Sequence, residues 1–168
     1  MKRVIVFGGS GSGKSTLARQ IGAITGLPVI HIDPMYWKPN WVQRSKEETR
    51  TLVLAATAQE AWVFDGNHHS TFAARIARAD HVIFLDLPTW LRVWRVMARS
   101  WRYRGKTRPD MGADCPERFD LHFVFKWVGG YHWRARPKDV AFMQTLPQHV
   151  TAVHLKSRAQ VAAYLGGL

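Results

Sequence analysis

The residues best suited to chemistry form one run near the start of the chain, Gly8-Gly9-Ser10-Gly11-Ser12-Gly13-Lys14-Ser15, which matches the pattern G-x-x-x-x-G-K-[ST]. Residues without side chains let consecutive backbone N–H groups turn towards one anion, and a following helix adds its unpaired N–H groups. Lys14 is expected to reach the β- and γ-phosphates of a triphosphate, and the Ser15 hydroxyl to coordinate Mg²⁺. The run therefore predicts a site for ATP and Mg²⁺ formed by Gly9, Ser10, Gly11, Ser12, Gly13, Lys14, Ser15 and Thr16, with Thr16 a candidate for the α-phosphate.

Three aspartates lie at or near the ends of predicted strands and are the next candidates. Asp65 comes directly after the apolar run Trp62-Val63-Phe64, where a carboxylate can hold Mg²⁺ directly or through water. Asp33 can accept the proton of an acceptor hydroxyl or bind a metal-bound water. Asp86 is a second acid, a helix-entry residue or a satisfied buried group. The alternative for Asp65 and Asp33 is a turn residue, since Asp-Gly and Asp-Pro both favour turns.

Aromatic and histidine side chains lie close to two of these aspartates in the sequence. The loop Met35 to Trp41 carries three aromatic rings around one proline, which could stack on a ring-shaped substrate or cover the core. His68 and His69 follow the Asp65 turn and could contact an acceptor phosphate or be solvated. None of the eight histidines has a zinc-binding spacing, and the chain has one cysteine.

Arginines dominate a predicted helix from Thr89 to Tyr103. Arg92, Arg95, Arg99 and Arg102 share one face, beside an apolar stripe formed by Leu91, Trp94, Ala98 and Trp101. This pattern predicts an amphipathic helix on which Arg92 and Arg95 are solvated.

The end of this helix is more crowded with positive charge. So many like charges repel unless an anion binds among them at least part of the time. We predict a lid over residues 103–118 that closes on ATP, with Arg99, Arg104 or Arg108 stabilising the charge on the transferring phosphoryl group. The predicted catalytic residues are Lys14, Asp33, Asp65, Arg99, Arg104 and Arg108.

The candidate site residues can lie together only if the strands before them end at the same edge of a sheet. The hydrophobic pattern predicts such a sheet. Short apolar runs alternate with segments of helical period, which is typical of parallel strands buried on both faces by helices. We predict an α/β fold with strands at 3–7, 28–32, 61–65, 81–87 and 150–155. Helices are expected at 14–25, 46–59, 70–79, 89–103 and 158–165, and also at 119–128 and 137–146. Ligands should bind at the carboxyl ends of the strands.

Composition narrows the class of protein. The 168 residues, 46% hydrophobic and 21% charged, predict one globular domain over residues 1–168, with no membrane-spanning run and no secretory leader. The lone Cys115 cannot form an intrachain disulfide and agrees with a cytoplasmic location. The net charge is +12, of which residues 91–138 supply +8, from twelve basic and four acidic residues. This charge favours phosphate-rich partners, either nucleotides or nucleic acid.

The chain resembles, nearly end to end, the bacterial "DNA topology modulation protein" group of adenylate-kinase-like P-loop proteins. The resemblance rests on the phosphate loop, Asp33, the Trp37-Lys38-Pro39-Asn40-Trp41 loop, the Trp62 to Asn67 segment and Arg104-Gly105-Lys106-Thr107-Arg108-Pro109-Asp110. It implies a three-layer P-loop NTPase fold with strand order 2-3-1-4-5, a mobile lid and Mg-ATP as donor. It also places Gly13, Lys14, Ser15 and Thr16 at the donor and Asp65 near the metal.

The resemblance does not extend to an acceptor. Adenylate kinases usually follow their third strand with D-G-[FY]-P-R, whereas here Asp65-Gly66 continues as Asn67-His68-His69. The predicted function is a kinase that transfers the ATP γ-phosphate to a small-molecule or nucleotide acceptor. The alternative is a nucleic-acid-associated ATPase or regulator linked to DNA topology, with phosphorylation of a polynucleotide 5′-hydroxyl ranked below both. A monomer and a homodimer are both compatible with the sequence.

Overall fold

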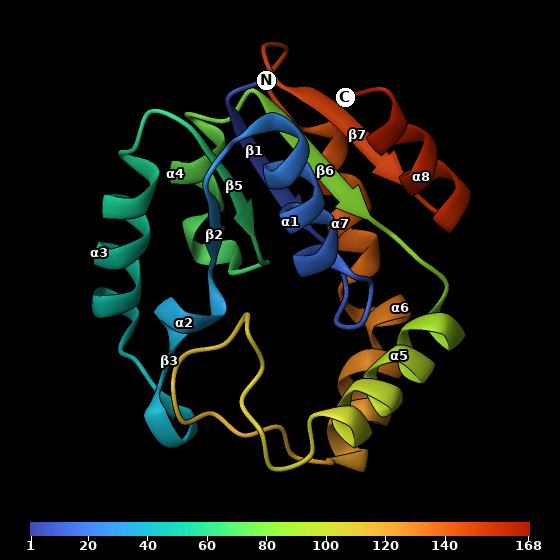
Figure 1. Cartoon of the computed structure of the whole chain (residues 1–168). Coiled ribbons are helices and arrows are strands. Elements are labelled where there is room, and N and C mark those ends of the chain that lie inside the picture. Colours follow the sequence, from blue (N-terminus) through green and yellow to red (C-terminus); the bar gives the residue numbers. More distant parts are fainter.

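A parallel five-stranded sheet forms the centre of the computed structural model, which describes residues 1–168 (Figure 1). Its strands are β1 (Arg3–Phe7), β2 (Val29–His31), β5 (Trp62–Asp65), β6 (His81–Leu85) and β7 (Thr151–Leu155), in the order β2-β5-β1-β6-β7. Every neighbouring pair is parallel. Counted along the chain, these strands have the order 2-3-1-4-5, so the predicted sheet is confirmed.

Helices cover both faces of the sheet and make three layers (Figure 1). One face packs on α1 (Lys14–Thr25) and α8 (Arg158–Gly166), and the other on α3 (Lys46–Thr57), α4 (Phe72–Ile76) and α7 (Arg136–Gln144). The two cores arise from alternation along β1, because Val4 and Val6 face the α1 side whereas Ile5 and Phe7 face the other. Apolar on both sides, β1 must be a central strand.

Several connections are more ordered than the sequence pattern predicts. The expected loop Met35 to Trp41 comprises the short helix α2 (Asp33–Tyr36) and a hairpin of β3 (Trp37–Lys38) and β4 (Val42–Gln43) around the 3-10 turn η1 (Pro39–Trp41). The helix predicted at 70–79 is shorter, with the 3-10 turn η2 (His69–Thr71) preceding α4. The segment predicted at 119–128 contains a π-helix, η3 (Phe123–Gly129), followed by α6 (Tyr131–Arg134).

The orientation predicted for helix α5 (Thr89–Arg102) is wrong. Arg92 is only 2% exposed, whereas Trp94 and Trp101, expected to pack inwards, are 63% and 76% exposed. The Arg92 guanidinium donates hydrogen bonds to the carbonyl oxygens of Leu87 and Val128 and lies over the Tyr131 ring. Backbone carbonyls and an aromatic face therefore satisfy the arginine, and the tryptophans are left facing outwards.

Arg95 also turns inwards. Its Nη1 donates to the Ser12 carbonyl in the phosphate loop at 2.9 Å, so the expectation of a solvated Arg95 is corrected as well. Both the arginines and the tryptophans recur at helical spacing, so periodicity alone could not tell which face packs inwards. No helix is both long enough and apolar enough to cross a membrane.

Residues 103–118 form an irregular segment that runs from the end of α5 past the phosphate loop to the β3–β4 hairpin and back (Figure 1). Two isolated bridges, Arg104 with Glu117 and Thr107 with Pro116, hold the two arms of the segment together. At the far end the Trp41 indole donates to the Pro116 carbonyl at 2.9 Å, and the Asn40 amide donates to the Asp114 carbonyl at 2.7 Å. The segment therefore spans the edge at which the parallel strands end.

Candidate active site

The phosphate loop has a backbone that only glycine can adopt without strain. Gly8, Gly11 and Gly13 all have positive φ angles, of 144°, 78° and 98°. A Cβ on Gly8 would lie 2.3 Å from the Leu85 carbonyl oxygen, and one on Gly11 would lie 2.4 Å from that of Arg92. The loop thus fits tightly between the end of β6 and helix α5, and leads directly into the N-terminus of α1.

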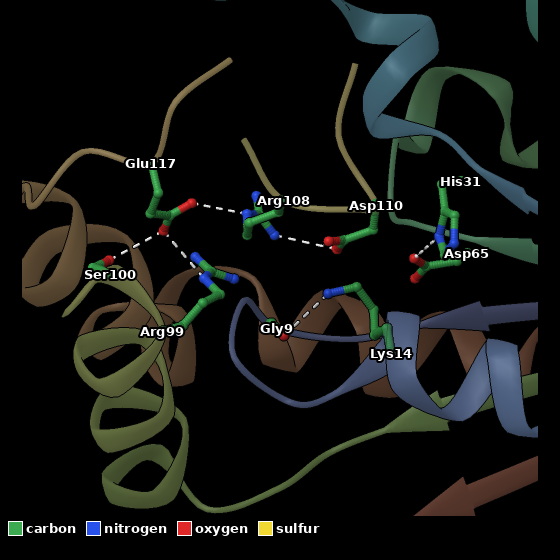
Figure 2. Close-up of polar contacts among 9 residues, drawn as sticks. All are labelled: Gly9, Lys14, His31, Asp65, Arg99, Ser100, Arg108, Asp110 and Glu117. Atoms are coloured by element: carbon green, nitrogen blue, oxygen red, sulfur yellow. Dashed lines mark hydrogen bonds and ion pairs between the residues drawn. The ribbon is translucent and has the colours of Figure 1, made fainter. Parts of the chain in front are cut away.

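Lys14 begins helix α1 and lies at the centre of the charged site. Its Nζ donates to the Gly9 carbonyl oxygen at 3.3 Å, which folds the side chain back over the loop (Figure 2). Burial lowers the pKa of Lys14, and the nearby arginines Arg99 and Arg92 act in the same direction, while Asp65 and Asp33 oppose the shift. Carboxylates and guanidinium groups therefore surround one ammonium group. An anionic ligand bound there would favour the charged form of Lys14.

Asp65 and His31 meet because of the strand register. They are opposite each other at the carboxyl ends of β5 and β2, and His31 Nδ1 lies 2.7 Å from Asp65 Oδ2 (Figure 2). The Asp65 side chain is buried, and its Oδ1 has no hydrogen-bond partner. An unpartnered buried carboxylate oxygen is costly unless a ligand or cation satisfies it. His31 was not predicted, although its place at a strand end was visible in the sequence.

Asp33 begins α2, immediately after the β2 strand end. Burial and the neighbouring Asp65 carboxylate raise the pKa of Asp33, and Asp110 adds to this effect, while Lys14 and Arg108 oppose it. A carboxyl group with a raised pKa, lining the same cavity as Lys14, is suited to accepting a proton.

Glu117 anchors the 103–118 segment over the phosphate loop. Its buried carboxylate accepts hydrogen bonds from Arg99 Nε and Ser100 Oγ, each at 3.1 Å, and forms an ion pair with Arg108 Nε at 2.8 Å (Figure 2). Arg99 comes from α5 and Arg108 from the segment, so one acid holds two arginines from different elements beside Lys14. Glu117 was not among the predicted site residues, because in the sequence it is only one of the four acidic residues between positions 91 and 138.

Asp110 extends this network to the phosphate loop. Arg108 Nη1 lies 3.2 Å from Asp110 Oδ2. Burial acts to raise the pKa of Asp110, but the Arg108 guanidinium, the backbone amide of Asp110 and the Ser15 side chain outweigh burial and lower this pKa. Asp110 therefore stays ionised beside the predicted metal-binding hydroxyl, a position that sequence analysis missed.

The structure brings most of the predicted site residues to one cavity and leaves two candidates outside the site. Lys14, Ser15, Asp33, Asp65, Arg99 and Arg108 all line one cavity of about 1630 Å³, together with Ser10 to Gly13 and Thr16. Arg104 is exposed and does not line it. Asp86 bonds to Arg136 Nε at 2.9 Å and to His154 Nε2 at 3.0 Å, which ties β6 to β7 and α7. This acid is a satisfied structural group.

The cavity has two recognisable ends. One end lies along α1, α5 and α8, where Arg19, Arg95, Arg158 and Ala162 line it. Four aromatic rings line the other end. They contact one another in the order His68, Tyr36, Trp37 and Trp41, and the centroids of neighbouring rings are 4.9 to 5.5 Å apart. The phosphate loop lies between the two ends, as a donor and an acceptor sharing one phosphoryl group would require.

Comparison with known proteins shows the fold. No protein-family model and no curated protein sequence matches the chain. Among solved structures, shikimate kinase from Acinetobacter baumannii in complex with shikimate has a TM-score of 0.58 at 15% identity over 99% of this chain and 90% of that one. Shikimate kinase from Bacteroides thetaiotaomicron has a TM-score of 0.59 at 16% identity over 99% and 95%.

A third similar structure is deoxyadenosine kinase from M. mycoides with bound dCTP, with a TM-score of 0.50 at 13% identity over 98% of this chain and 97% of that one. These likenesses span nearly the whole length of all the chains. The protein therefore has the α/β P-loop fold that these small kinases share.

Proposed function

We propose that this protein is an ATP-dependent kinase that transfers the γ-phosphate to a hydroxyl group of a small acceptor. The observation that carries the proposal is the position of Lys14, which lies on the phosphate loop among Asp33, Asp65 and Arg99 at the carboxyl edge of the sheet. Phosphoryl transfer needs positioning and charge stabilisation more than covalent chemistry, and this site supplies both.

The residues present fit a bound Mg²⁺ ion. Asp65 Oδ1 is buried without a partner, and the Ser15 hydroxyl and the Asp65 carboxyl are oxygen ligands of the kind that Mg²⁺ prefers. Ser15 and Asp65 would hold the ion, and His31 fixes the orientation of the Asp65 carboxylate. When bound, Mg²⁺ would neutralise negative charge on the β- and γ-phosphates.

The other site residues divide the remaining tasks. The loop amides and Lys14 bind the phosphates, and Asp33 accepts the proton of the acceptor hydroxyl. Arg99 and Arg108 stabilise charge on the transferring phosphoryl group, while the 103–118 segment acts as a lid. The end of the cavity at α1, α5 and α8 receives the nucleoside of ATP, because it adjoins the phosphate loop opposite Asp33.

Calorimetry and turnover test this function together. Titration with Mg-ATP is expected to give a binding signal that depends on the metal and weakens strongly in Lys14→Ala. ATP consumption should rise sharply with one compound from a panel of nucleosides, nucleoside monophosphates and hydroxylated metabolites, and Asp33→Asn should abolish the rise. Lys106→Ala is the control, because this lysine is exposed and outside the cavity lining. A Lys14→Ala protein that behaves like its parent would refute the proposal.

A second candidate function, association with nucleic acid, is favoured by one observation. Five of the eight tryptophans are at least 60% exposed, and three of them, Trp90, Trp94 and Trp101, share one face of α5 with Met97. Three basic side chains are also exposed in this part of the chain, Arg102 on α5, Lys126 on η3 and Arg134 on α6. Aromatic faces interleaved with cations can stack on unpaired bases while neutralising phosphates.

Fluorescence anisotropy with a labelled single-stranded oligonucleotide tests this candidate. Binding should weaken steeply as salt rises, because phosphate contacts release counterions, and Trp94→Ala with Trp101→Ala should weaken it at every salt concentration. The matched control is Leu52→Ala with Leu54→Ala, since these side chains are exposed on α3. Absence of binding at low salt, or binding that the tryptophan changes leave intact, would count against this function.

A further inference from the structure

The end of the cavity beyond the phosphate loop has an unusual charge for a kinase that handles phosphates. We define the acceptor half as the part lined by residues 32–46, 65–70 and 109–111. Three carboxylates line it, those of Asp33, Asp65 and Asp110. Asp65 retains a buried oxygen without a partner, and Asp33 forms no hydrogen bond or ion pair through its side chain.

The arginines near this half already have acidic or carbonyl partners, and Lys14, which lies near Asp33 and Asp65, is assigned to the donor phosphates. Arg108 pairs with Glu117 and Asp110, and Arg99 pairs with Glu117. Arg75 is fully buried and donates to three successive carbonyl oxygens, those of Gly66, Asn67 and His68, at 2.6 to 3.2 Å. It supports the loop after β5 from behind and does not line the cavity.

The remaining cationic candidates are weak anchors for an anion. Burial, with Arg75 and His69 nearby, lowers the pKa of His68, which disfavours the cationic imidazole that an anion would need. His31 bonds to Asp65, and His69 Nε2 lies 3.6 Å from Asp139. Among the residues that define the acceptor half, Lys46 is the one lysine or arginine, and it is exposed; Lys14 and Arg108 line the adjoining part of the cavity. No arginine there could form a bidentate contact with a phosphate or carboxylate.

Aromatic side chains form the other wall. Tyr36, Trp37 and Trp41 are half-buried and line the cavity, with ring centroids 4.9 Å apart for the first pair and 5.5 Å for the second. Such a wall offers a surface on which a ring can stack. In a cavity that acids also line, this surface favours a ligand whose hydroxyl or amino hydrogens bond to carboxylates.

We infer that the acceptor is a ring-bearing alcohol without phosphate or carboxylate, either uncharged or cationic, of the nucleoside or amino-sugar class. This inference rests on the proposed kinase function. Asp33 takes the hydroxyl proton, and the acceptor oxygen forms a bond to the γ-phosphorus. The bond from that phosphorus to the β–γ bridging oxygen breaks, and its electron pair leaves with ADP. An anionic group on the acceptor would lie near the Asp33 carboxylate, which has no cationic partner, and near Asp110, whose charge Arg108 already offsets. No arginine without an acidic partner is available to bind it, and such like-charge placement is disfavoured.

Matched acceptor pairs test the inference. Transfer from γ-labelled Mg-ATP is measured for adenosine against AMP, cytidine against CMP, glucosamine against glucosamine 6-phosphate, and glucose against glucuronate. We expect kcat/KM to favour the member without the anionic group by about 100-fold or more in at least one pair. Equal or faster transfer to the anionic members would overturn the inference. So would a panel without any phosphorylated uncharged member, if Mg-ATP still binds in a Lys14-dependent manner.

Failure of the kinase function would look different, because Mg-ATP would then give no Lys14-dependent calorimetric signal at all. Two variants sharpen the result. Trp37→Ala should raise KM for the acceptor about tenfold, with KM for ATP unchanged and partial recovery in Trp37→Phe, because about 1.4 kcal/mol of ring contact is lost. Trp133→Ala is the matched control, because this side chain is exposed on α6 and does not line the cavity. Lys46→Ala should leave the preference within twofold, whereas a selective loss for an anionic acceptor would identify an anion anchor and refute the inference.

Discussion

The phosphate loop and the 103–118 segment face the same cavity but are built in different ways. The loop is held by backbone geometry. Three of its glycines have positive φ angles, and two of them pack against the backbones of Leu85 and Arg92. The segment is held by side chains, chiefly Glu117 with Arg99 and Arg108. The first arrangement is pre-formed and rigid, whereas the second depends on a few ion pairs. In the proposed kinase, phosphates would therefore bind to a fixed cradle, and the arginines would be brought to them.

The largest expected effect comes from removing the arginines held by Glu117. Replacing Arg99 and Arg108 together by Ala should lower kcat by about 10³-fold, because arginines stabilise charge that develops in the transition state. Affinity for Mg-ATP should stay within about tenfold, because the loop remains intact. Arg104→Ala is the matched control and should change kcat less than about twofold, since Arg104 is exposed outside the cavity. Steady-state kinetics with calorimetry decide, and an intact kcat in the double variant would contradict this role.

The next effect tests the backbone cradle itself. Gly11→Ala should weaken Mg-ATP binding about 100-fold, because its Cβ would lie 2.4 Å from the Arg92 carbonyl oxygen and the positive φ would be strained. Gly105→Ala is the control, since it also has a positive φ but has open space around its Cβ position. Calorimetric titration gives both affinities, and equal losses in the two variants would show that strain alone explains the result.

Glu117→Gln tests the side-chain clamp and should have a moderate effect. The free energy of unfolding should fall by about 2 kcal/mol, because two arginines lose the charge that compensates them. This value lies below the range for fully buried pairs, since the Arg99 side chain is 27% exposed. Urea unfolding provides the measurement, with Lys38→Ala as the control, whose solvent-exposed pair with Glu48 should contribute little to stability. Equal losses would mean that the clamp contributes no more than a surface pair.

The smallest effect is a shift in pH dependence. Asp33 acts as a base only when ionised, so kcat/KM should rise with pH through the pKa of this carboxyl group. Burial and Asp65 raise that pKa, so the rise should lie above the ordinary value of an aspartate. Asp65→Asn removes one raising charge and should move the rise to lower pH, even though it lowers the rate overall. A pH–rate profile that stays in place would exclude Asp33 as the titrating group.

Most of the fold could be predicted from the sequence, because its signals are local. The apolar run of β1, the glycines after it and the alternating strand and helix patterns define the sheet and the phosphate loop. Helix α5 shows where this reasoning fails. Its arginines and tryptophans have equivalent periodicity, and only contacts with Leu87, Ser12 and Val128 decide that the arginines turn inwards.

The site could be predicted in part for the same reason. Lys14, Ser15, Asp33 and Asp65 lie in or directly after recognisable elements. Glu117 and Asp110 lie in an irregular segment, and their partners come from α5, from the segment itself and from α1, so no spacing rule links them. His31 reaches Asp65 through strand register, which becomes visible only when the order of the sheet is known. Arg104 and Arg108 are four residues apart, yet only Arg108 lines the cavity.

The hydrogen bonds that join the β3–β4 hairpin to the 103–118 segment have a consequence for the release of products. Asn40 and Trp41 both have φ angles near 60°, a conformation that asparagine tolerates but that is strained for tryptophan, and hydrogen bonds to Asp114 and Pro116 hold the two residues there. Any outward motion of the segment breaks those bonds and lets the hairpin relax. If the segment opens during turnover, departure of one product would then help to release the other. The buried thiol of Cys115, which bonds to the Lys38 carbonyl oxygen at the same contact, would become accessible on opening, so its rate of modification would report that motion.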